Sequence, residues 1–212
     1  MEDKLMKIYS KVTNVPLKIM GGHFATNHSH INYYIDMTTL KTRQSEALAV
    51  AAELASHYMH IGTVDTIVCL DGMQVVGAYL AEKLSEAGVL STNQHKTIYI
   101  VTPEFNSNSQ MIFRDNILPM IHRKNIIMLM ASVTTGLTIN KGEECVQYYG
   151  GNLKGISSIF SAIDKWDGVP VSSVFTMKDL PGYQTYNYRD CPFCKRGIPL
   201  DALVNSYGYS KL

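Results

Sequence analysis

The chain has 212 residues, 46% of them hydrophobic, and a formal net charge of +1 from 19 Lys+Arg against 18 Asp+Glu. A charge this close to zero does not favour binding to nucleic acid, so no nucleic-acid partner is expected. No apolar run approaches the ~20 residues of a membrane span, so no membrane partner is expected either. The N-terminus has acidic residues and no apolar signal core, and four cysteines do not suggest a disulfide scaffold, so we expect a cytoplasmic protein.

The first third of the chain predicts two helices around a hairpin. Residues 2–10 have the pattern of a short amphipathic helix. Residues 23–26 and 31–35 predict strands joined by a turn near Asn27, His28 and Ser29. Residues 40–60 are rich in Ala, Glu and Leu, which predicts a helix with Gly62 as its stop signal.

Strand and helix patterns alternate through the middle of the chain. Helical patterns cover residues 74–87, closed by Gly88, and a segment that runs from the turn at 132–136 through Tyr148. The polar loop at 102–112 has a length typical of a functional lid or a disordered segment. Short apolar runs predict strands at 65–70, 96–101, 126–131, 155–163 and 171–177.

This alternation predicts an α/β fold, a parallel sheet flanked by helices, with its ligand site beyond the carboxyl ends of the strands. The length suits one domain over 1–212. We divide it into a small N-terminal hood and first helix over about 1–60, an α/β core over 61–178 and a tail over 179–212.

The turn after the strand at 126–131 is a candidate anion site. The first N–H groups of a helix have no partner inside it, and the helix dipole favours negative charge there. Thr134, Thr135 and Thr138 would add hydroxyl donors, and Gly136 would let the main chain approach a phosphate monoester. The segment is not a P-loop, and ordinary helix capping is the alternative.

Three motifs resemble type I phosphoribosyltransferases, and orotate phosphoribosyltransferases in particular. They are V-T-T-G-x-T at 133–138, the segment from G-H-F at 22–24 to Y-Y-I-D at 33–36, and the tail C-P-F-C-K-R-G-I-P-L at 191–200. Their order and spacing agree with the family from about residue 20 to 200.

The resemblance implies a fold, an activity and site residues. The fold is a parallel sheet with a hood, and the activity is transfer of phosphoribosyl from phosphoribosyl diphosphate to a pyrimidine base with Mg²⁺, in a homodimer. The polar loop would take the place of the mobile catalytic loop. By position, the phosphate site would be Ser132, Val133, Thr134, Thr135, Gly136, Leu137 and Thr138; the diphosphate loop Asp71, Gly72 and Met73; and the base pocket Phe24, His28 and Ser29.

Two departures from the family bear on mechanism. The family's adjacent acids before the V-T-T-G turn are Met130 and Ala131 here, and neither side chain serves a ribose hydroxyl or Mg²⁺. The mobile-loop stretch 101–108 contains Glu104 and no Lys or Arg to neutralise a leaving diphosphate. We therefore assign no catalytic residue and no metal ligand.

Three hypotheses stay open. The first is an active transferase with altered metal and leaving-group chemistry. The second is a catalytically degenerate sensor or regulatory protein that binds a small-molecule nucleotide or phosphoribosyl diphosphate. The third is an assembly subunit with an emptied pocket.

Cys191 and Cys194 form a CxxC pair, which is half of a zinc site. Cys69 in a strand and Cys145 in a helix are not placed to complete it, so we expect ordinary thiols rather than zinc. A zinc shared across a dimer, or completed by histidine, is the alternative. Strand alternation is expected to split His23, His28 and His30 between two faces, which favours polar lining over a metal site.

Two further groups, the aspartates beside Trp166 and the tyrosines of the tail, are expected to have structural roles. Asp164 and Asp167 flank Trp166 and predict a turn, although Asp164 would follow a strand end and face the cleft. The tail tyrosines are more typical of packing or a subunit contact than of a cofactor site: Tyr183, Tyr186 and Tyr188.

Overall fold

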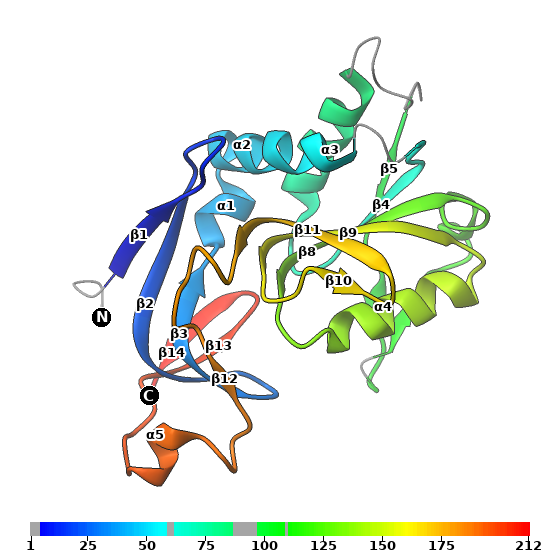
Figure 1. Ribbon diagram of the computed structural model, residues 1–212. Helices are drawn as coiled ribbons and strands as arrows, with labels where there is room; N and C mark the ends of the chain where they lie inside the picture. Colours follow the sequence, from blue (N-terminus) through cyan, green and yellow to red (C-terminus); the bar gives the residue numbers. More distant parts are fainter. Residues whose placement is uncertain (1–4, 59–61, 87–96, 109) are drawn as a thin grey trace.

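The computed structural model describes residues 5–58, 62–86, 97–108 and 110–212, and its centre is a parallel sheet (Figure 1). The strand order is β10-β11-β9-β8-β4-β5, and every neighbouring pair except β10 with β11 is parallel. The five predicted strands are thus confirmed within the described residues, with small shifts at their ends; Lys96, where one of them was predicted to begin, lies outside those residues. They are β4 (Thr66–Cys69), β5 (Tyr99–Val101), β8 (Asn125–Val133), β9 (Asn152–Ser161) and β11 (Val169–Thr176). The short strand β10 (Lys165–Trp166) was not predicted.

Helices cover both faces of this sheet, as the sequence predicts (Figure 1). Alternate side chains of β8 point to opposite faces, because a strand has a side-chain period of two. Ile127, Leu129 and Ala131 join the first core cluster, which includes residues of α1 (Thr38–Thr42), α2 (Gln44–Ala55) and α3 (Gln74–Glu86). Ile126, Met128 and Met130 join a second cluster, which includes residues of α4 (Leu137–Tyr148).

The helix predicted over 40–60 is divided in the structure. It begins earlier, breaks at Arg43 between α1 and α2, and ends in a 3-10 turn, η2 (Ser56–Tyr58). Gly62 has φ +94 and lies four residues beyond that turn, and Gly88 lies outside the described residues. None of the described helices is long and apolar enough to cross a membrane.

The hood is a second sheet, built from both ends of the chain (Figure 1). Its order is β12-β3-β2-β13-β14, and β1 also pairs with β2. The tail strand β13 runs parallel to β2, with Ala202 opposite Phe24, so the tail belongs to the hood. The strands are β1 (Leu5–Tyr9), β2 (Pro16–Ala25), β3 (His30–Asp36), β12 (Thr185–Tyr186), β13 (Ala202–Asn205) and β14 (Gly208–Lys211).

The helix predicted at residues 2–10 is wrong, because the described part of that segment is strand β1. Its residues pair antiparallel with β2, from Leu5 opposite Met20 to Tyr9 opposite Pro16. A helix this short is marginal in isolation, whereas pairing gives the backbone a hydrogen-bonded partner and lets Ile8 pack against the first core cluster.

The polar loop at 102–112 is a hairpin rather than an irregular lid. Strand β6 (Glu104–Phe105) pairs antiparallel with β7 (Met111–Ile112). The turn is held by Asn106, whose Oδ1 accepts the N–H groups of Asn108 and Gln110 at 2.9 and 3.0 Å. A short 3-10 turn, η3 (Leu118–Met120), follows before β8.

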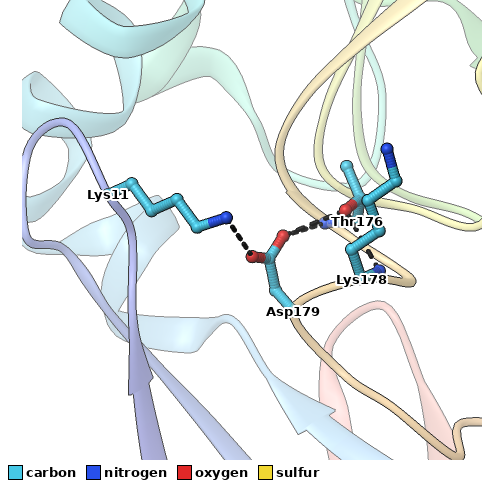
Figure 2. A network of polar contacts seen from close by, with 4 residues as sticks. All are labelled: Lys11, Thr176, Lys178 and Asp179. Carbon is cyan, nitrogen blue, oxygen red and sulfur yellow. Dashed lines mark hydrogen bonds and ion pairs between the residues drawn. The ribbon is translucent and has the colours of Figure 1, made fainter.

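A polar network marks the point where the chain leaves the central sheet for the tail (Figure 2). Asp179 Oδ2 accepts hydrogen bonds from the N–H and hydroxyl of Thr176 at 2.9 and 3.0 Å, and the Thr176 hydroxyl accepts from the Lys178 N–H. Lys11, between β1 and β2, places Nζ 3.9 Å from Asp179 Oδ1. The hydrogen bonds shape the turn, while the exposed ion pair contributes little stability.

Candidate functional site

A cavity of about 350 Å³ lies where the hood faces the carboxyl edge of the parallel sheet. Three turns surround it: residues 26–29 between β2 and β3, residues 205–208 between β13 and β14, and the turn after β8. The residues of this last turn that line the cavity are Ser132, Thr134, Thr135, Leu137 and Thr138. The site therefore lies beyond the strand ends, where the fold class predicts it.

The turn at 132–138 has the features of an anion site. Among the described residues, no protein acceptor is found for the N–H groups of residues 134–139, and no partner for the hydroxyls of Thr134, Thr135 and Thr138. A small hollow of about 40 Å³ is lined by Met130 and residues 132–139 alone. Because the turn opens the 12-residue helix α4, its free donors and the helix dipole both favour a negative ligand.

Gly136 fixes the shape of this turn. It is the N-cap of α4 with φ +79, a backbone conformation that residues other than glycine rarely adopt. A Cβ at this position would lie 2.0 Å from Cζ3 of Trp166, whose Nε1 donates to Glu143 Oε2 at 3.0 Å. The missing side chain thus makes room for the indole. Gly136 also lines the small hollow at the turn, and the expectation that its main chain lies close to a ligand stays a prediction.

The predicted turn around Trp166 is confirmed. Lys165 and Trp166 form β10, and Asp167 with φ +41 and Gly168 with φ +80 reverse the chain into β11. Asp164 accepts a backbone hydrogen bond from Val171 through its carbonyl oxygen, and it does not line the described cavity.

Asp71 is the carboxylate that reaches the cavity. It has φ +53, an uncommon conformation for a residue with a side chain, and its Oδ2 accepts the N–H of Ala131 at 3.3 Å. Burial raises the pKa of Asp71, while the Ala131 N–H and the Lys41 ammonium act in the opposite direction. Of the other residues in its loop, Met73 is buried in the first core cluster and Gly72, with φ +76, makes the turn.

Lys41 lies in the cavity wall beside Asp71, and sequence reasoning missed it. Its Nζ donates to the carbonyl oxygens of Asp71 at 2.9 Å and Ser206 at 2.5 Å. Burial lowers the pKa of Lys41, against the carboxylates of Asp71 and Asp36, which raise it. A buried lysine in a helix of only five residues has no sequence signature, because its partners come from distant turns.

The hood turn brings two of the three predicted base-pocket residues to the cavity. His28 and Ser29 line it, in a turn held by Thr26, whose hydroxyl donates to the Ser29 carbonyl at 3.0 Å and accepts the Ser29 N–H at 2.9 Å. Phe24 does not line it, because its side chain is only 1% exposed in the first core cluster, near Tyr34. The apolar lining that sequence reasoning missed includes Tyr34, Phe160, Tyr183 and Val204.

The two positions that hold acids in the family have different surroundings here. Ala131 lines the cavity, whereas the Met130 side chain packs into the second core cluster on the other face of the sheet. Among the described lining residues, Asp71 is the one carboxylate, so these residues do not form a paired-acid site for Mg²⁺. Arg114 is not among the described lining residues; its Nη2 pairs with Glu104 Oε2 at 2.7 Å.

A separate cluster lies between the β2–β3 hairpin and the tail segment at 191–194. His23, His30, Cys191 and Cys194 each place one ligand atom within 4.8 Å of all the others. The expected split of the histidines is therefore wrong for His23 and His30. Ala25 pairs with His30, and His23 lies two residues from Ala25 on the same strand, so both histidines share a face.

The comparisons with known proteins agree with this architecture. No family model matches the chain. The orotate phosphoribosyltransferase of Chlorobaculum parvum is 26% identical over 186 residues, 87% of this chain and 88% of that protein. The orotate phosphoribosyltransferase of Pelotomaculum thermopropionicum is 23% identical over 199 residues, 93% of this chain and 94% of that protein.

Solved structures show the same fold at low sequence identity. Leishmania donovani UMP synthase superposes with a TM-score of 0.56 at 14% identity over 85% of this chain, which spans only 36% of that longer protein. Mycobacterium tuberculosis orotate phosphoribosyltransferase in complex with 5-phospho-alpha-D-ribosyl 1-diphosphate gives a TM-score of 0.51 at 12% identity, over 69% and 82% of the two chains. The chain therefore has the type I phosphoribosyltransferase fold.

Proposed function

We propose that this chain, with its type I phosphoribosyltransferase fold and its sequence similarity to orotate phosphoribosyltransferases, binds the 5′-phosphate of a nucleotide at residues 132–138. The observation that carries the proposal is the row of N–H groups at 134–139 without protein acceptors among the described residues, at the edge of the cavity. Thr135, Leu137 and Thr138 are exposed, so these donors are open to a ligand, and the oxygens of a phosphate can accept from several of them at once.

The rest of the cavity suits the remainder of a nucleotide. Its volume of about 350 Å³ is within the range of small-molecule sites, about 300–1,000 Å³. Asp71 supplies a carboxylate that can accept hydrogen bonds from ribose hydroxyls, and His28 and Ser29 supply polar groups for the base. Tyr34 and Phe160 supply apolar surface beside them.

The same residues favour a nucleotide-binding sensor or regulator over an efficient transferase. Transfer from phosphoribosyl diphosphate develops positive charge on the ribose and needs cations for the leaving diphosphate. Ala131 offers no carboxylate, and Lys41 already donates to two carbonyl groups. The loss of one preorganised group costs about 10²–10³ in rate, so the two missing acids together would slow the chemistry severely.

The first experiment compares phosphorylated and unphosphorylated ligands. We expect UMP and orotidine 5′-monophosphate to raise the melting temperature, and uridine to leave it almost unchanged, because uridine lacks the group that the turn binds. Stabilisation by uridine equal to that by UMP would show that residues 132–138 do not bind the 5′-phosphate.

Variants then locate the site. Thr135→Val and Thr138→Val each remove a donor to a charged group, worth about 1.5–3 kcal/mol, so UMP should bind roughly 10- to 100-fold more weakly in calorimetry. Thr63→Val is the matched control, because Thr63 is exposed and its hydroxyl accepts from Asn125 at the start of β8, the opposite end of that strand. Equal affinities in all three variants would place the ligand elsewhere.

The second candidate function is phosphoribosyl transfer itself. Similarity over nearly the whole length to proteins named orotate phosphoribosyltransferase supports it, and so does the carboxylate of Asp71 beside the Ala131 backbone. Turnover of phosphoribosyl diphosphate with orotate or another base, in the presence of Mg²⁺, would establish an enzyme. Absence of turnover with every base would leave the binding function alone.

We also propose a homodimer. Exposed apolar side chains support it: Tyr99 and Ile100 lie on β5, the edge strand of the central sheet, and Phe105 lies on β6 of the hairpin that follows. Sedimentation at micromolar concentration should give twice the mass of 23.7 kDa, and a monomer at that concentration would refute the proposal.

A further inference from the structure

The side-chain cluster that joins the hood to the tail has the composition of a metal site. His23 lies on β2, His30 begins β3, Cys191 is the N-cap of the short helix α5 (Pro192–Lys195), and Cys194 lies within that helix. His23 Nε2 lies 3.0 Å from His30 Nδ1, 3.4 Å from Cys191 Sγ and 3.6 Å from Cys194 Sγ. Cys194 Sγ lies 3.3 Å from His30 Nδ1.

These separations match the edges of a small tetrahedron. Zinc bonds of about 2.3 Å to sulfur and about 2.0–2.1 Å to nitrogen give edges of about 3.3 Å between two nitrogens and about 3.6 Å between nitrogen and sulfur. The four measured distances lie within about 0.3 Å of these values. Two thiolates and two imidazoles are also the donor set that zinc prefers in structural sites.

The surrounding groups orient His23 as metal-binding histidines are oriented. Its Nδ1 lies 2.9 Å from the Ile198 carbonyl oxygen, so Nδ1 carries the proton and donates, and Nε2 presents its lone pair to the cluster. Its ring stacks on Phe193 at 5.1 Å between centroids. Asp201 Oδ2 accepts the His23 backbone N–H at 2.8 Å, which fixes the main chain beneath the ring.

A cluster held by hydrogen bonds alone fits these contacts less well. With Nδ1 committed to a carbonyl, His23 Nε2 is a single acceptor facing three neighbours at 3.0–3.6 Å, and only one of them can donate along its lone pair. Both cysteines are free thiols, so no disulfide holds the group together. One cation at the centre would satisfy all four ligand atoms together.

We propose that His23, His30, Cys191 and Cys194 bind one structural zinc ion, through His23 Nε2, His30 Nδ1 and the two sulfur atoms. On binding, Zn²⁺ replaces the two thiol protons, which pass to solvent, and no electron is transferred. This assignment replaces the expectation from sequence that Cys191 and Cys194 are ordinary thiols. The two missing ligands are histidines, His23 from β2 and His30 from β3, as in the alternative of a zinc completed by histidine.

The position of the ion gives it a structural role. It ties the β2–β3 hairpin to the tail segment that leads into β13, and both flank the cavity through the turns at 26–29 and 205–208. Because zinc would cross-link residue 23 to residue 191, it would hold these two segments of the hood together. Four protein ligands leave no open position, so a structural and not a catalytic ion is implied.

The test measures metal and ligand identity in the full-length chain. Protein kept reduced with a phosphine and supplied with zinc is passed through gel filtration and analysed by plasma mass spectrometry. We expect one zinc per chain. Cobalt-loaded protein should show the tetrahedral d–d bands and the thiolate-to-cobalt charge-transfer band that two sulfur ligands produce.

Matched variants assign the ligands. Cys194→Ser changes an exposed ligand and should weaken zinc binding at least about 10-fold and reduce the charge-transfer band. Cys145→Ser and His28→Asn should keep one zinc, because Cys145 Sγ contacts the Met111 carbonyl and His28 is not in the cluster. If Cys194→Ser does not fold, the cobalt spectrum of the unmodified chain still counts its sulfur ligands.

Three results would overturn the proposal. Folded, reduced and zinc-supplied protein that retains no zinc would exclude the site. Equal zinc affinity in Cys194→Ser and in the unmodified chain would place the metal elsewhere. A cobalt spectrum without a thiolate band would show that the sulfur atoms are not ligands.

Discussion

Replacing Gly136 by alanine probes the turn on which the proposed phosphate site depends. The backbone has φ +79, and a left-handed conformation costs a residue with a Cβ about 1–2 kcal/mol. The new Cβ would also lie 2.0 Å from Cζ3 and 2.5 Å from Cε3 of Trp166, and overpacking of this kind costs about 1–3 kcal/mol. The sum is a loss of about 2–5 kcal/mol of unfolding free energy.

Gly168→Ala is the matched control. Gly168 has φ +80, but nothing lies within 4 Å of its virtual Cβ, so only the backbone cost of about 1–2 kcal/mol applies. Urea unfolding followed by circular dichroism gives both losses. For a chain of 212 residues, each kcal/mol also lowers the melting temperature by about 2–4 °C.

The difference between the two variants isolates the contact with Trp166. We expect Gly136→Ala to lose about 1–3 kcal/mol more than Gly168→Ala, and Trp166→Ala to remove most of that excess in a double-mutant cycle. Gly136→Ala should also bind UMP more weakly, since displacing the indole moves the donors at 134–139. Equal losses in the two glycine variants would refute the account of this turn.

Three further predictions concern the cavity. Lys41→Met removes the cation between the carbonyl groups of Asp71 and Ser206 and should cost about 1.5–3 kcal/mol of stability in urea unfolding; an unchanged midpoint would contradict this. Burial raises the pKa of Asp71 above its ordinary 3.8, so the stability it contributes is full below that value and is lost as pH rises through the folded pKa. As pH rises through the folded pKa, the free energy of unfolding of Asp71→Asn should therefore increase relative to that of the unmodified chain. A difference that does not change with pH would contradict a raised pKa. Ala131→Asp adds a second carboxylate beside Asp71, so calorimetry should show UMP binding that is weaker without Mg²⁺ and restored by it; equal binding with and without Mg²⁺ would count against this geometry.

Local patterns were enough to predict the central sheet. The run Ile126–Ala131 is apolar at every position, and it proved to be a strand buried on both faces, with its even and odd residues in different core clusters. The turn at 132–138 was predicted for the same reason, because a strand, a small-residue turn and a helix occur consecutively in the chain.

The hood was only half predictable, because it joins segments far apart in the sequence. The hairpin around Asn27 has its own turn chemistry, but β13 pairs with β2 across more than 170 residues, which no local pattern indicates. Phe24 was expected in the base pocket, yet it packs inward, because the family motif gives its position and not its face.

The charged groups of the cavity show the same limit. Lys41 meets Asp71 and Ser206, each from a different segment, so its place in the wall follows from the fold alone. The cluster of His23, His30, Cys191 and Cys194 could not be predicted for the same reason. The sequence shows the CxxC pair and the two histidines, but the histidines share a face only because Ala25 pairs with His30 in the folded sheet.

Amide chemical shifts are the most direct test of the phosphate site. In a ¹⁵N-labelled chain titrated with ribose 5-phosphate, we expect the largest shifts at residues 134–139, where the free N–H groups lie, and small shifts with ribose alone. Shifts that are the same for both sugars, or that leave residues 134–139 unchanged, would contradict the account.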